Sequence, residues 1–204
     1  QQRLAAQAER ITRGDRLEAE NAQLRALLEL RASSTVPGQP AEILFELSDR
    51  YSRRIMIDRG SQQGLSLSAA VINERGLLGQ ITRLYPFSSE VTLLQDPFIS
   101  VPVINRRTRM RGVAFGDGLE GSGMELRFVA ANADVQPGDE LITSGLDGVF
   151  PAGLPVARVV SVQRQGASSF ARIDLAAVAP ADGVRHLLVL PLSRPAEPKG
   201  ASAK

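Results

Sequence analysis

The stretch TSGLDGVFPAGLPV (residues 143–156) places one serine, three glycines and two prolines in a segment that otherwise resembles a bent strand. Two catalytic motifs have a similar spacing of small residues, but neither is complete in this stretch. A nucleophile elbow requires G-x-S-x-G, but Ile142 stands where the first glycine belongs. A phosphate loop requires lysine and a hydroxyl residue after its second glycine, where this chain has Leu154 and Pro155. The spacing therefore favours a turn between two strands.

Glycine and proline have different tasks in such a turn. Glycine adopts positive φ angles or allows a close backbone approach, whereas proline stiffens the chain. We expect the two strands to be joined by a structural turn that contains Ser144, Gly145, Gly148, Pro151, Gly153 and Pro155.

Composition limits the classes of function that remain. The chain has 204 residues, 43% of them hydrophobic, which is enough for one or two small domains. The formal charge of +2 is too balanced to indicate nucleic-acid binding. No cysteine is present and the only histidine is His186, which excludes disulfides and a His/Cys zinc site. We expect no metal and no cofactor.

The first 32 residues have the composition of a helix. Leu17 and Leu24 occupy heptad position d, and Asn21 and Leu28 occupy position a. Asparagine at position a favours a two-stranded coil of fixed register. We predict a coiled coil that forms a homodimer through these four side chains; the alternative is a helix that packs on its own domain or stays solvated.

Beyond a linker at residues 33–40, the chain has the pattern of short strands separated by turns. Apolar residues alternate in EILFEL (Ile43, Phe45, Leu47), in MELRF (Met124, Leu126, Phe128) and in ARIDLAA (171–177). Residues 64–84 also resemble residues 138–162, which suggests two similar units. The fold class is therefore mainly β, with two small barrels or a sandwich, and the polar tail 193–204 is predicted to be disordered.

Two further motifs carry alternative functions. GDGLEG (116–121) matches G-x-G-x-x-G, but strand alternation follows where a dinucleotide site needs a helix. Arg107, Arg109 and Arg111 alternate, so a strand would place them on one face as an anion or partner contact. No aromatic residue lies between them to stack on bases, which argues against nucleic acid.

Several blocks together resemble the family of the bacterial rod shape-determining protein MreC. The resemblance covers residues 41–192 and rests on PGDELITSGLDGVFPAGLPVARV (137–159), IDRGSQQGL (57–65), VINERGLLGQITRLYPFSSEVTLLQDP (71–97) and VPVINRRTRMRGVAFGDG (101–118).

The resemblance implies a dimeric, non-enzymatic scaffold in the periplasm. Members of the family have one transmembrane helix in the inner membrane, so we expect a membrane anchor upstream of this region. The implied partners are the elongation-specific class B penicillin-binding protein, whose active state the scaffold favours, its glycosyltransferase partner RodA, the membrane protein MreD and the actin-like MreB.

The resemblance also implies a nested arrangement of two six-stranded-type barrels. We assign residues 41–70 and 131–192 to the first barrel and residues 71–130 to the second. The alternative function is a serine hydrolase on a two-barrel fold, with Ser144 as nucleophile and His186 as base. The distance between the Ser144 hydroxyl and His186 separates the scaffold from the hydrolase, because a hydrolase needs these two side chains within hydrogen-bond reach.

Overall fold

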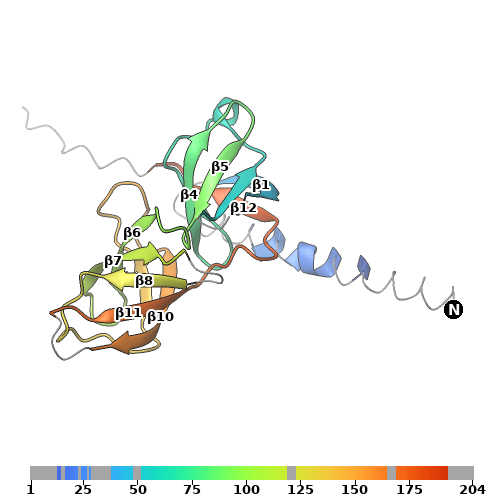
Figure 1. The fold of residues 1–204 in the computed structure, drawn as a ribbon. Helices are drawn as coiled ribbons and strands as arrows, with labels where there is room; N and C mark the ends of the chain where they lie inside the picture. The colour runs from blue at the N-terminus through green and yellow to red at the C-terminus, as the bar shows by residue number, and fades with distance from the viewer. Residues whose placement is uncertain are drawn as a thin grey trace, which may run out of the picture.

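The computed structural model describes residues 13–14, 17–22, 24–26, 28, 38–47, 52–118, 123–164 and 169–192. Within these residues, the strands form two closed antiparallel β-barrels of six strands each (Figure 1). Closure leaves neither sheet with an unpaired edge. The expected fold class of two small six-stranded barrels is confirmed.

Barrel A takes its strands from both ends of the described β region. Its order around the barrel is β1-β12-β3-β4-β5-β2. A short 3-10 helix, η1 (Ser61–Gln63), follows β2. The strands are β1 (Gln39–Glu46), β2 (Arg54–Ile57), β3 (Ala70–Ile72), β4 (Leu77–Leu84), β5 (Ser89–Leu93) and β12 (His186–Val189).

Barrel B is formed by the strands that lie between β5 and β12 in the sequence. Its order is β10-β11-β8-β7-β6-β9. The strands are β6 (Ser100–Asn105), β7 (Arg111–Gly116), β8 (Gly123–Arg127), β9 (Glu140–Thr143), β10 (Pro155–Gln163) and β11 (Arg172–Ala177).

These pairings correct the expected division of the chain into 41–70 with 131–192 and 71–130. Strands β3, β4 and β5 form a meander whose outer strands pair with β12 and β2, so residues 70–93 close barrel A. Strands β9, β10 and β11 pair with β6 and β8, and therefore belong to barrel B. The nested barrel is formed by residues 100–177.

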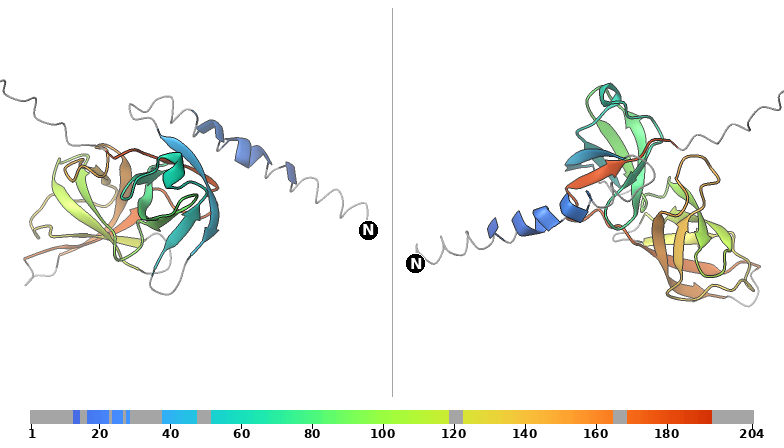
Figure 2. Two further views of the ribbon diagram at one scale, coloured as in Figure 1. Left: turned by 90° about the horizontal axis from the view of Figure 1, so that it is seen from above. Right: turned by 180° about the vertical axis from the view of Figure 1, so that it is seen from behind.

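The described part of the N-terminal segment, residues 13–14, 17–22, 24–26 and 28, is helical. Figure 2 shows this helix beside barrel A and pointing away from barrel B. The pairing of this helix with the helix of a second copy in a coiled coil stays a prediction. The rest of residues 1–32, most of the linker and the tail 193–204 lie outside the described residues, and β1 begins at Gln39, inside the expected linker. No described helix is long and apolar enough to cross a bilayer.

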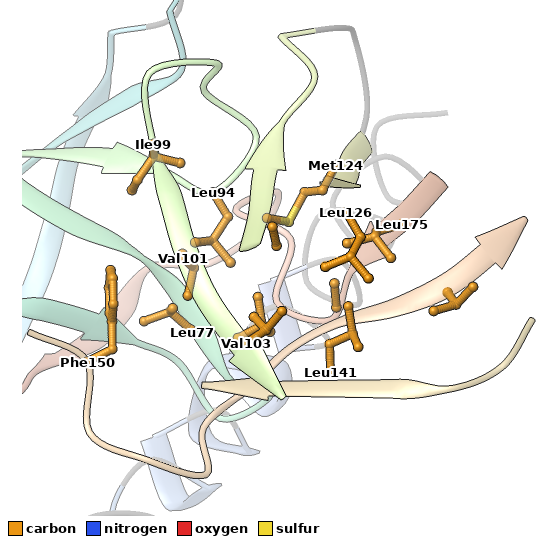
Figure 3. Packing of buried hydrophobic residues seen from close by; sticks show 14 of the residues in the cluster. Leu77, Leu94, Ile99, Val101, Val103, Met124, Leu126, Leu141, Phe150 and Leu175 are labelled. Atoms are coloured by element: carbon orange, nitrogen blue, oxygen red, sulfur yellow. The ribbon is translucent and has the colours of Figure 1, made fainter. Parts of the chain in front are cut away.

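One buried apolar cluster continues from barrel B into barrel A, while a second fills the interior of barrel A. Phe150, from the loop between β9 and β10, belongs to the first cluster together with Leu77 of barrel A and Val101 of barrel B (Figure 3). Leu188 of barrel A also belongs to this cluster. Phe150 is only 3% exposed. The β9–β10 loop therefore packs the two barrels against each other.

Glycine permits the closest approach at this junction. Gly76, in the turn between β3 and β4, has a φ of 156°, and a Cβ atom there would collide with the carbonyl oxygen of Pro155 at the start of β10. The two barrels thus meet backbone to backbone next to the cluster that contains Phe150. Such a contact fixes their relative position, because close-packed interiors deform little.

Replacing Phe150 by alanine tests this junction. Phe150→Ala should lower the free energy of unfolding by about 3–5 kcal/mol, since it leaves a cavity between the barrels. The control is Leu146→Ala in the same loop, where the side chain is 64% exposed and the change should stay within about 0.5 kcal/mol. Urea denaturation measures both. Equal effects of the two substitutions would show that the loop does not hold the barrels together.

Candidate functional site

The loop between β9 and β10 uses its polar groups internally. The Thr143 hydroxyl donates to the Pro151 carbonyl, and the Leu154 amide donates to the same hydroxyl at 2.9 Å. The Ser144 hydroxyl accepts a hydrogen bond of 3.3 Å from the Leu146 amide. The Asp147 carboxylate accepts hydrogen bonds of 3.1 Å from the amides of Val149 and Phe150. These bonds close the turn and direct Phe150 into the core.

The glycines of this loop adopt the backbone that other residues avoid. Gly145, Gly148 and Gly153 have φ angles of 72°, 68° and 90°. A Cβ atom at Gly145 would lie 2.7 Å from the Cβ atom of Ala152, so this position also has no space for a side chain. A structural role in a tight turn accounts for all three glycines.

The structure does not bring the hydrolase candidates together. Ser144 follows β9 of barrel B, whereas His186 begins β12 of barrel A. The imidazole Nε2 of His186 lies 3.6 Å from a carboxylate oxygen of Glu20 on the helix. The polar interactions found in the described part of the chain include no contact between Ser144 and His186.

The expected row of arginines on one strand face is wrong. Arg107 and Arg109 lie in the turn between β6 and β7, and only Arg111 lies on a strand. The reason is Asn105, whose side-chain oxygen accepts hydrogen bonds from the amides of Arg107 and Thr108 and so reverses the chain. An anion or partner contact by Arg109 and Arg111 stays a prediction.

Arg107 is instead part of a structural ion-pair cluster. Its guanidinium lies 2.7 Å from carboxylate oxygens of both Asp134 and Asp139. Asp139 is nearly buried and also accepts a 2.7 Å bond from Asn105. Hydrogen bonding to Arg107 lowers the pKa of Asp139 to about 2 and lowers the pKa of Asp134. The cluster fastens the β6–β7 turn to the loop before β9.

The predicted dimer seam of the helix faces solvent in the single chain. Leu17, Asn21, Leu24 and Leu28 are all exposed. Their apolar atoms are therefore available to a second helix.

The alternation of apolar residues in the sequence did not predict a group of exposed aromatic side chains on barrel B. Met124 and Leu126 are buried as the alternation predicts, but Phe128 is 71% exposed. The cause is its backbone, because a φ of 65° interrupts the pleat directly after β8 and turns the side chain outward. Among residues other than glycine, mainly asparagine, aspartate and histidine adopt this conformation, so the strain at a bulky phenylalanine is a reason to look for a function.

Phe128 is the centre of a group of side chains that we call the aromatic surface: Phe115, Arg127, Phe128 and Phe170. The rings of Phe115 and Phe128 meet edge to face, with centroids 6.2 Å apart. The Arg127 guanidinium carbon lies 4.7 Å from the Phe115 centroid and its Nε bonds to Glu125. Phe170 is 56% exposed and lines, with Phe128, an open groove of about 440 Å³.

On barrel A too, apolar side chains that were expected to face inward are exposed. Ile43 is half-buried, but Phe45 is 52% exposed and Leu47 is also exposed. A register shift between Ile43 and Phe45, where β1 pairs with β2, removes Phe45 from the inward face. The two outward-facing rings have different causes: a register shift at Phe45, where an extra residue reverses the direction of later side chains, and a left-handed backbone at Phe128.

The described residues contain no group of three or more His, Asp or Glu side chains that could hold a metal ion. The two barrels are packed together at their junction and form one rigid body. Aromatic side chains that face outward give this body exposed apolar surfaces.

Comparison with known proteins identifies the family. The model of "Rod shape-determining protein MreC, barrel core" matches residues 43–191. The chain belongs to the MreC family. It is similar to the cell shape-determining protein MreC of Haemophilus influenzae, with 36% identity over 176 residues that cover 86% of this chain and 50% of the relative. The chain spans about half the length of the relatives it matches.

Solved structures agree with the fold. A structure named MreC is 34% identical, covers 85% of this chain and 98% of its own, and superposes with a TM-score of 0.80. A second is described as a complex between Penicillin-Binding Protein (PBP2) and MreC from Helicobacter pylori, with 18% identity, a TM-score of 0.62 and coverage of 78% of this chain and 100% of its own. At that identity it shows the fold alone.

MreC is a family of non-enzymatic structural proteins. The alternative of a serine hydrolase with Ser144 and His186 is therefore wrong. The glycine loop that prompted it is part of the barrel core that defines the family.

Lowering the pH should weaken the contribution of the ion pairs of Asp139 to the free energy of unfolding. Because its folded pKa of about 2 is below the ordinary value of 3.8, its stabilisation is present above that ordinary value and is lost as the pH falls toward 2. Asp139→Asn should remove roughly 2 kcal/mol of the pH-dependent change in unfolding free energy across this interval. Urea denaturation at a series of pH values measures it. The exposed Asp182→Asn should keep the wild-type slope, and an unchanged slope in Asp139→Asn would contradict the assignment.

Proposed function

We propose that this region is the periplasmic part of a membrane-anchored, non-enzymatic scaffold of the cell-elongation machinery, and that it binds and activates the elongation-specific class B penicillin-binding protein. Membership of the MreC family supports the scaffold role. The Helicobacter pylori complex of PBP2 and MreC supports the choice of partner, because that MreC shares this fold.

The wider setting is proposed from the same family. A single-pass anchor in the inner membrane would precede the helix and hold the barrels in the periplasm. RodA, MreD and MreB would be the further members of the assembly. Homodimerisation through Leu17, Asn21, Leu24 and Leu28 would place two pairs of barrels side by side.

We place the contact with the synthase on the aromatic surface of barrel B. Interface centres are rich in aromatic side chains and arginine, and poor in other charged residues. The aromatic surface is rich in these residue types: Arg127 stacks on Phe115, Phe115 meets Phe128 edge to face, and Phe170 lines the same groove, while the charge of Arg127 is paired with Glu125. The left-handed backbone of Phe128 costs about 1–3 kcal/mol in such positions, which the fold tolerates in order to expose the ring.

Activation without a catalytic group follows from differential binding. A scaffold that binds one conformer of the synthase more tightly shifts its population by no more than the difference in binding free energy. A rigid ligand is suited to this task, because little of its binding energy is lost in ordering its own surface. The buried junction between the barrels provides that rigidity.

The helix would contribute by multivalency. Two barrel pairs joined by a coil bind two neighbouring synthases with a high effective concentration and without any new contact. The gain therefore depends on clustering of the synthase on a surface, whereas the intrinsic affinity of one barrel pair stays the same.

The dimer seam is tested by charge. Leu24→Glu combined with Leu28→Glu should leave the barrels folded and shift the protein from dimer to monomer, because two buried charges cost several kcal/mol per ion. Sedimentation velocity measures the species. A dimer that persists in the double variant would place the interface elsewhere on the chain.

The aromatic surface is tested by removing its rings without strain. Phe128→Asn keeps a residue that accepts positive φ, and combined with Phe170→Ser it should weaken binding to the periplasmic region of the class B penicillin-binding protein by about tenfold to a hundredfold. Isothermal titration calorimetry measures the affinity.

The matched control is Phe87→Asn, a phenylalanine of barrel A that is 64% exposed. It should bind like the wild type. If Phe87→Asn weakens binding and the barrel B double variant does not, the contact lies on barrel A and the assignment to the aromatic surface is wrong.

A further inference from the structure

Four exposed arginines gather around the β6–β7 turn of barrel B. Arg106 and Arg109 belong to the turn, Arg111 begins β7, and Arg158 lies on β10, next to β9. Arg106 and Arg158 share one carboxylate, that of Glu140, at 3.1 and 3.0 Å. The side chains of Arg109 and Arg111 make no hydrogen bond or ion pair with the described residues. We call these four side chains the arginine border.

The arginine border and the aromatic surface lie on one face of barrel B. Ala114 of β7 is fully buried. Because side chains alternate along a strand, Arg111, Val113 and Phe115 therefore point outward together. Val113 lies between the two groups and pairs with Arg127 of β8. At about 3.3 Å per residue, Arg111 is about 13 Å from Phe115 along the strand. One partner can thus contact both groups at once.

The backbone at Arg109 is strained. Its φ of 62° is left-handed, and among the described residues other than glycine only Ser68 and Phe128 share this feature. Its amide closes the turn by donating to the Asn105 carbonyl at 2.9 Å. Glycine or asparagine would fit this position with less strain. The fold therefore retains strained residues at two places beside the same outward face, Arg109 and Phe128.

The arginine border has more positive charge than its neighbours neutralise. Its four guanidiniums face one carboxylate, that of Glu140. The neighbouring Arg107 pairs with both Asp134 and Asp139, and this cluster offsets only one further positive charge. An excess of positive charge remains on this face. Exposed guanidiniums are suited to carboxylates, because their planar fork donates two parallel hydrogen bonds.

We propose that the arginine border binds an acidic segment of the synthase, beside the apolar contact that the aromatic surface makes. The inference rests on the proposed function, since it assigns a second recognition element to the same partner. Exposed charges at the edge of an interface act mainly on the association rate, whereas most other interface contacts act on the dissociation rate. The arginine border therefore steers the synthase into place, and the rings of the aromatic surface hold it there.

Association kinetics with the periplasmic region of the class B penicillin-binding protein test the steering. Arg109→Gln combined with Arg111→Gln should slow association about three- to tenfold at about 50 mM salt. The difference should vanish at about 1 M salt, where the screening length falls to about 3 Å. Arg109→Lys combined with Arg111→Lys retains both charges and should associate nearly as fast as the wild type. Stopped-flow fluorescence with a dye-labelled synthase measures the rates.

The matched control is Arg75→Gln combined with Arg83→Gln, which removes two exposed arginines of barrel A and changes the net charge equally. It should keep the wild-type association rate. Equal slowing by this control, or an unchanged association rate and salt dependence in Arg109→Gln with Arg111→Gln, would overturn the arginine border while the proposed function stands. A wild-type protein that does not bind the synthase at any salt concentration would overturn the proposed function, and this inference with it.

Discussion

The packing of the β9–β10 loop between the two barrels is the contact on which the rest of the structure depends. Phe150 joins side chains of both barrels in one buried cluster, and Gly76 lets the two backbones approach at Pro155. Neither barrel is large, and a small domain buries a limited fraction of its surface. Sharing a core across the junction adds apolar burial for both, and it makes the two barrels one rigid body on which exposed surfaces have fixed positions.

The proposed binding surface consists of aromatic side chains that point outward from a closed barrel. Strands in a closed barrel have no free edge to offer a partner, so recognition must use side chains that point outward. At Phe45 a register shift and at Phe128 a left-handed residue turn large rings away from the core. Irregularities of this kind cost stability locally. The well-filled cores and the ion pairs of Asp139 offset that cost, so the fold retains strain where a partner would bind.

The helix differs from the barrels in how it is held. The barrels are joined by buried apolar contacts, which depend little on pH, whereas the helix touches barrel A through Glu20, Arg185 and His186. Contacts of this type are weak, screened by salt and sensitive to protonation. The molecule thus joins a rigid two-barrel body to a helix whose described contacts with barrel A are ion pairs.

Local sequence patterns were sufficient to predict the β class, the helical arm, the structural role of the glycine loop and the family. These features depend on local signals: alternation in residues 171–177, heptad spacing at Leu17 and Leu24, and fixed spacing of glycine and proline in residues 143–156. The likeness of residues 64–84 to 138–162 even marks one hairpin in each barrel, β3–β4 and β9–β10. Strand pairing between distant segments decided the division at residues 100–177, because strands of both barrels have the same alternation. Bulges and the Asn105 turn decided which side chains face outward, since one added residue or one positive φ reverses a pattern that sequence alternation assumes to be regular.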